Sequence, residues 1–105
     1  MLLTQQPYRD PKLRLADLAA LVDVPPHRLS QVISASGHTN FADFINRYRI
    51  EEFKRLAQAE SYQQFTVLAL AYEAGFNSKT TFHTAVKKAT GLTPGRLRQQ
   101  VAGTA

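Results

Sequence analysis

Two short amphipathic segments separated by a single glycine place the tightest limit on how this chain can fold. They lie within residues 65–98. Thr66 can cap the first segment, and Gly75 can adopt the left-handed conformation that ends a helix within one residue. Asn77 or Ser78 can cap the second, whose apolar side chains at helical spacing are Phe82, Ala85, Val86 and Ala89. The pattern predicts a helix, a tight turn and a second helix, which is the arrangement that places a helix in a DNA major groove.

The side chains that face away from this apolar stripe are polar or basic, and none is acidic. They are Lys79, Thr80, His83, Thr84, Lys87 and Lys88. Gly91 should end the second helix. The Thr93-Pro94 pair should begin another, because threonine can cap a helix and proline fits its first turn. The last third of the chain is therefore predicted to hold three helices with a basic outer surface.

The positive charge is concentrated at the C-terminal end of the chain. The net charge is +5, and residues 74–105 hold five Lys and Arg against no Asp or Glu, whereas residues 40–73 hold four against five. A basic end is often only a solvated tail. Its coincidence with the helix-turn-helix pattern favours binding to the phosphates of DNA.

Length and composition exclude several other classes of protein. A chain of 105 residues suits one small composite domain, and without cysteine it can form neither a disulfide framework nor a thiolate zinc site. His27, His38 and His83 lack the spacing of a metal motif, and nothing suggests an oxyanion hole. No apolar run approaches the roughly 18 residues of a membrane span, and no signal peptide is evident. We therefore expect a cytoplasmic, nucleoid-associated protein that is not an enzyme and needs no metal or cofactor.

The same plan recurs in residues 13–35. Asp23 can take the place of the turn glycine, because aspartate tolerates the left-handed conformation. Pro26 fits the first turn of the next helix, whose apolar side chains Leu29, Val32 and Ile33 are expected to point inward. Apolar positions match the second copy at an offset of 52 before the turn and 53 after it, which indicates a duplication. Upstream, residues 1–6 are expected to end a helix and residues 8–11 to form a turn.

Residues 40–59 predict one long helix between the two copies. An apolar stripe runs along it, and charges of alternating sign follow at i, i+4 spacing at Asp43, Arg47, Glu51 and Arg55. Twenty residues span roughly 30 Å, close to the roughly 34 Å of one DNA turn. The expected division is a first helix-turn-helix subdomain at 1–39, a linker helix at 40–60 and a second subdomain at 61–105.

Residues 71–98, AYEAGFNSKTTFHTAVKKATGLTPGRLR, resemble the DNA-binding domain of AraC/XylS-type bacterial transcription regulators. The motif elements are an alanine, Gly75-Phe76, the aromatic Phe82, the Val86-Lys87-Lys88 run, Gly91-x-x-Pro94 and a closing Arg98. With the upstream copy and the linker, the resemblance covers nearly the whole chain. Three departures stand out: Arg14 replaces a Ser or Thr cap, Gly37 lies one residue early relative to Gly91, and Val86 replaces a phenylalanine.

The resemblance implies an all-α fold of about seven helices, in which two helix-turn-helix units insert into adjacent major grooves. The base-contacting residues that it implies are His27, Ser30, Gln31, Lys79, Thr80, His83 and Thr84. The phosphate-contacting residues that follow from position and charge are Arg47, Lys87, Lys88, Thr93, Arg96 and Arg98. The implied partners are double-stranded DNA, RNA polymerase if the protein is an activator, and a second copy if an upstream domain dimerises.

One alternative function comes from another class, a helical protein-interaction module that does not bind DNA. It would explain the apolar stripes of the helices. It would leave the acid-free C-terminal third without a reason.

Overall fold

The chain is all-α, as the sequence predicts. The computed structural model describes residues 7–37 and 40–103, and it contains no strand within them. Six α-helices and two 3₁₀ helices follow one another in this part of the chain: η1 (Pro7–Arg9), α2 (Leu15–Val22), α3 (Pro26–Ala35), α4 (Phe41–Gln58), η2 (Glu60–Tyr62), α5 (Val67–Glu73), α6 (Lys79–Thr90) and α7 (Pro94–Gly103). The helix end expected at residues 1–6 lies outside the described residues. The turn expected at 8–11 is in part the 3₁₀ helix η1.

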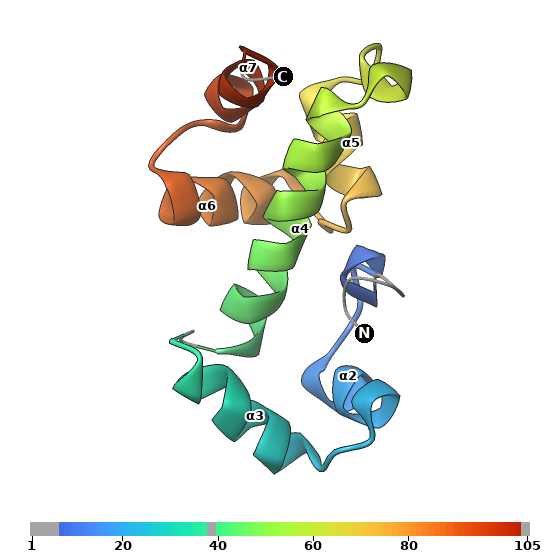
Figure 1. Cartoon of the computed structure of the whole chain (residues 1–105), viewed down its shortest axis with the longest axis vertical. Helices are drawn as coiled ribbons and strands as arrows, with labels where there is room; N and C mark the ends of the chain where they lie inside the picture. The colour runs from blue at the N-terminus through green and yellow to red at the C-terminus, as the bar shows by residue number, and fades with distance from the viewer. Residues whose placement is uncertain (1–6, 38–39, 104–105) are drawn as a thin grey trace.

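The long helix α4 is the axis around which the other helices are arranged (Figure 1). Helices α2 and α3 lie at its N-terminal end, and α5, α6 and α7 surround its C-terminal half. The molecule measures 41 × 26 × 24 Å along its principal axes. The expectation of one long helix between two helix-turn-helix units is therefore confirmed.

Short polar side chains begin most of the helices. Thr66 Oγ1 accepts from the Ala69 amide at 3.0 Å, and Ser78 Oγ accepts from the Thr81 amide at 3.1 Å. Both are caps that the sequence predicts. Asn40 Oδ1 likewise accepts from the amide of Asp43 at 2.8 Å. These bonds satisfy backbone donors that have no partner inside the helix, and so they fix where each helix begins.

Helix α2 begins without a side-chain acceptor at its cap position, Arg14. Its first turn is held instead by Asp17, whose carboxylate accepts from the Arg14 backbone amide at 3.0 Å. That bond and the one from the Arg14 side chain lower the pKa of the Asp17 carboxyl. Arginine at this position thus removes one half of a capping box and leaves the other half in place.

The two helix-turn-helix turns share a residue of positive φ and an equivalent backbone hydrogen bond. Asp23 and Gly75 have φ of 58° and 110°, so both are left-handed as predicted. In each turn, the amide of the next residue donates to an equivalent carbonyl of the preceding helix. Val24 donates to the Ala19 carbonyl at 3.1 Å, and Phe76 donates to the Ala71 carbonyl at 3.0 Å. These pairs are related by the offset of 52 that the sequence repeat predicts, which supports the duplication.

Most of the core belongs to the second unit and to the C-terminal half of α4. Phe53 of α4 and Phe76 each lie 5.1 Å from the ring of Phe82, centroid to centroid. The buried cluster around them comprises Ile50, Leu56, Ala57, Leu70, Ala71, Ala74, Val86, Leu97 and Val101. Fewer side chains are buried around the first unit, mainly Leu18, Ala19 and Ile33 of α2 and α3 and Ile45 of α4. The second unit therefore carries most of the apolar burial.

The inward position predicted for Val32 is wrong. Its side chain is 55% exposed, whereas Ile33 is buried and Leu29 is half-buried. Leu29 and Ile33 are four residues apart and form the inner stripe of α3. Val32 lies about 100° around the helix from Ile33 and so leaves that stripe.

A short N-terminal segment, residues 8–10, is bound to α4 by a buried arginine. We call this segment the strap. Arg49 is 6% exposed, and its guanidinium donates to the Tyr8 carbonyl at 2.6 Å and the Asp10 carbonyl at 2.8 Å. A third bond reaches Asn46 Oδ1 at 3.1 Å. Burial lowers the pKa of Arg49, and the nearby Asp10 carboxylate opposes that shift. The guanidinium replaces its lost hydration with these acceptors.

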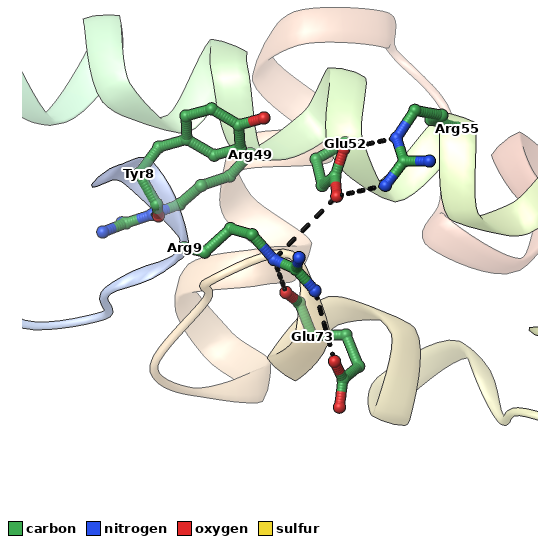
Figure 2. Close-up of polar contacts among 6 residues, drawn as sticks. All are labelled: Tyr8, Arg9, Arg49, Glu52, Arg55 and Glu73. Carbon is green, nitrogen blue, oxygen red and sulfur yellow. Dashed lines mark hydrogen bonds and ion pairs between the residues drawn. The ribbon is translucent and has the colours of Figure 1, made fainter. Parts of the chain in front are cut away.

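The strap also reaches the C-terminal end of α5 through Arg9 (Figure 2). Arg9 Nε donates to the Glu73 carbonyl at 2.9 Å, and Nη2 donates to its carboxylate at 3.3 Å. The same Nε lies 3.9 Å from Glu52, a carboxylate that is 4% exposed and receives two bonds from Arg55 at 2.8 and 2.7 Å. The bonds to Glu52 raise the pKa of Arg55. The strap thus fastens α4 to α5.

The backbone of the strap passes directly against Gly75. A Cβ there would lie 2.2 Å from the Tyr8 carbonyl oxygen, whereas a Cβ at Gly91 would meet nothing within 4 Å. We expect Gly75→Ala to lower the free energy of unfolding by about 3 kcal/mol or more, because a steric clash adds to the cost of a left-handed alanine. Gly91→Ala should cost only about 1 kcal/mol. Urea denaturation of both variants measures the difference, and equal losses would contradict the close approach.

Arg49→Met tests the bonds between the strap and α4. We expect a loss of about 2–4 kcal/mol in unfolding free energy, because one buried and one partly buried carbonyl lose their donor. Arg47→Met is the matched control, since Arg47 is exposed on the same helix and should change stability by less than about 0.5 kcal/mol. Thermal and urea denaturation followed by circular dichroism provide the comparison. An Arg49→Met protein as stable as the control would show that the strap contributes little.

Candidate nucleic-acid interface

Helix α6 buries one side and leaves a basic, hydroxyl-rich side in solvent. Phe82 and Val86 are buried in the core. The six outward residues that the sequence predicts are all exposed: Lys79, Thr80, His83, Thr84, Lys87 and Lys88. The helix is therefore anchored by its apolar stripe and offers its polar side to a partner.

A groove lies on one side of α6, between it and the N-terminal half of α4. We call it the α4–α6 groove. Helix α6 contributes Thr80, Thr84 and Lys88 to its lining, and α4 contributes Asp43, Asn46 and Arg47. The structure thus brings predicted base-contacting and phosphate-contacting residues together from two helices.

A second depression lies on the other side of α6, where α7 begins. We call it the α6–α7 groove, and its lining includes His83, Thr84, Lys87, Lys88 and Thr93. Thr93 Oγ1 accepts from the Arg96 amide at 3.3 Å, so the threonine caps α7. The backbone amides at the start of α7 add a partial positive charge at this edge. Helix α6 is accordingly a ridge between two grooves that contain basic and hydroxyl groups.

Three predicted residues of the second unit lie outside these grooves. Lys79 is exposed on the first turn of α6, and Arg96 is exposed on the first turn of α7. Arg98 is half-buried, and its Nη2 donates to the Gln63 carbonyl at 3.3 Å. That bond ties α7 to the segment after α4. We therefore do not include Arg98 in the proposed interface.

The predicted residues of the first unit lie together on α3. His27, Ser30 and Gln31 are all exposed, and so are Arg28 and Val32. An offset of 53 relates His27, Ser30 and Gln31 to Thr80, His83 and Thr84. Both helices turn their C-terminal ends toward the same side of α4 (Figure 1). Sequence reasoning missed Val32 as a surface group, because its apolar character alone suggested burial.

Two ion pairs within α4 have a spacing other than the predicted i, i+4. The ion pairs within the helix join Glu51 to Lys54 and Glu52 to Arg55, at i, i+3 spacing. Asp43 forms an ion pair with Lys88 of α6, with 3.0 Å between Oδ1 and Nζ. Sequence reasoning missed Asp43 and Asn46 as groove residues, since only the fold brings the start of α4 beside α6.

The sequence matches a family of known proteins along most of its length. The model of the family described as "Helix-turn-helix domain", which is of the AraC type, matches residues 18–100. This chain belongs to the AraC-type helix-turn-helix family. The resemblance noted from the sequence is thereby confirmed. The chain is a DNA-binding domain of the kind found in transcription regulators, and this family is not enzymatic.

Solved structures share the AraC-type fold of this chain. The C-terminal domain of AraT, a response regulator from Geobacillus stearothermophilus, has a TM-score of 0.72 and 26% identity, with 91% of this chain and 77% of that chain covered. A protein of unknown function from Listeria innocua has a TM-score of 0.69 and 25% identity, with 91% and 88% covered. The C-terminal domain of the two-component response regulator yesN from Fusobacterium nucleatum has a TM-score of 0.69 and 24% identity, with 90% and 88% covered. None of the curated proteins compared with the chain matches it.

Residues 7–37 and 40–103 contain no group of three or more His, Cys, Asp or Glu side chains that could hold a metal ion. His38 lies outside these residues. Among the same residues, no helix has the length and apolar character needed to cross a membrane.

Proposed function

We propose that this domain binds double-stranded DNA by placing α3 and α6 in successive major grooves. The observation that carries the proposal is the form of α6, an exposed polar ridge with a groove along each side. A major groove is about 12 Å wide, admits one α-helix and has a phosphate backbone along each edge. A helix between two basic grooves suits that shape.

The phosphate backbones would meet the residues that line the two grooves. Arg47 and Lys88 lie in the α4–α6 groove, and Lys87 and Thr93 lie in the α6–α7 groove. Arg96 follows on the first turn of α7. Cationic side chains and a helix N-terminus are common partners of DNA phosphates, and such contacts fix the position of a protein on the duplex.

Base recognition would come from the exposed polar side of α3 and of α6. On α6, Lys79 can donate to guanine O6 and N7, and Thr80 and Thr84 can offer a hydroxyl or a methyl group. On α3, Gln31 can pair with adenine in bidentate fashion. The remaining candidates on the exposed sides of these helices are His27, Ser30 and His83.

The length of α4 supports simultaneous binding by the two helices. Its 18 residues span about 27 Å, and successive major-groove faces are about 34 Å apart. The longest dimension of the molecule, 41 Å, leaves room for that separation. One chain can therefore occupy two half-sites on one face of a duplex.

Binding to duplex DNA should weaken steeply as salt rises. With four cations proposed at the phosphates, a plot of log affinity against log salt should have a slope of about −3 or steeper. Fluorescence anisotropy with a labelled duplex of mixed sequence measures it. No binding at low salt, or binding that does not change with salt, would refute the proposed function and favour a protein-interaction module.

Lys79→Ala and Lys87→Ala should have different effects. Lys79→Ala should relax the base preference at one position, with a cost of about 1–3 kcal/mol on the preferred sequence. Lys87→Ala should weaken all sequences alike and reduce the salt slope by about 1. Selection from a randomised duplex pool, followed by affinity measurements, separates the two effects. Each variant has the same charge change, so each is the control for the other. Equal, sequence-independent losses would remove Lys79 from base recognition.

A further inference from the structure

One carboxylate faces the basic side of α6. The described residues from Gly75 onward include no Asp or Glu, so the C-terminal unit supplies no acid of its own there. Asp43 comes from the start of α4 and lies 3.0 Å from Lys88 across the α4–α6 groove. A carboxylate at this place opposes the binding of a polyanion.

The two partners of this ion pair differ in how firmly the fold holds them. Asp43 is the third residue of α4, its amide is bound to the Asn40 cap, and its side chain is 25% exposed. The Lys88 side chain is 59% exposed and has a flexible four-carbon stem. The carboxylate is thus fixed by the fold, whereas the ammonium group can turn toward another anion.

We propose that Asp43 limits the DNA affinity of this domain by competing with the phosphate backbone for Lys88. The inference rests on the proposed function. In free protein, Lys88 is neutralised by Asp43. When a duplex enters the groove, a phosphate must draw Lys88 from its partner, and the carboxylate remains nearby as a like charge. Both effects act on the backbone, so they reduce affinity for every sequence.

Such a residue has a definite consequence for binding in a genome. Phosphate contacts supply most of the affinity for non-specific DNA. An acid that weakens them shortens the time spent at every site, because phosphate contacts are also made at preferred sequences. Asp43 is therefore a residue that lowers the overall affinity and residence time on DNA without contacting a base, and it does so by placing a like charge beside the phosphates.

The variant Asp43→Asn removes the charge and keeps the shape. We expect it to bind random duplexes about two- to fivefold more tightly at low salt, which is the range set by an exposed ion pair. The salt slope should steepen by up to about 0.9, the value for one further phosphate contact. Anisotropy titrations at several salt concentrations give both quantities.

Asp17→Asn is the matched control. Asp17 is the third residue of α2, forms an i, i+3 ion pair with Arg14 and does not line the α4–α6 groove. The variant makes the same change in net charge at the same helical position. It should leave affinity and salt slope close to those of the wild type. Thermal unfolding of both variants shows that each is folded at the assay temperature.

A double-mutant cycle tests whether Asp43 acts through Lys88. We expect Lys88→Ala to weaken binding more in the Asp43→Asn background than in the wild type, since Lys88 is available to phosphate only in the former. Equal losses would show that Asp43 acts by long-range repulsion alone, which overturns the proposal. Unchanged or weaker binding by Asp43→Asn would overturn it as well. If wild-type protein binds no duplex, the proposed function itself has failed.

Discussion

The bonds from Arg49 to the backbone of the strap are the interactions on which the rest of the structure depends. They join residues 41 and 39 positions apart in the chain, Tyr8 and Asp10 to Arg49. Because the strap is held there, Arg9 can reach Glu73 and Glu52, and the Tyr8 carbonyl lies directly over Gly75. The turn of the second helix-turn-helix unit is thus packed against the N-terminal segment. The position of α6 follows from that turn.

The two units are unequal versions of one plan. The second unit has the larger core and the capped helices α5 and α6, and its described residues from Gly75 onward include no Asp or Glu. The first unit has the smaller core, an aspartate in its turn and an arginine at its first cap. Packing and charge therefore favour a larger contribution from the second unit to phosphate affinity. In the proposed complex, the exposed side chains on α3 would let the first unit contribute base contacts.

Local features of the fold could be predicted from the sequence, and long-range features could not. Caps at Thr66 and Ser78 and turns at Asp23 and Gly75 depend on a few neighbouring residues. The burial of Arg49 and Glu52 depends on the strap and on α5, which the pattern along α4 does not show. The predicted burial of Val32 was wrong for a related reason, since the residues around it on α3 did not show which apolar side chains would face the core. The pairing of Asp43 with Lys88 required knowledge of how α6 crosses α4.

Helix α4 determines both the distance between α3 and α6 and the angle by which one is rotated relative to the other about the axis of α4. Its N-terminal half packs against the first unit and its C-terminal half against the second. One residue of an α-helix corresponds to about 100° of rotation and about 1.5 Å of rise. A single insertion or deletion within α4 would thus rotate α3 about the axis of α4 by about a quarter turn while barely moving it along that axis. The number of residues in α4 therefore sets the rotational phase between α3 and α6, and point substitutions on the exposed sides of these two helices would not alter that phase.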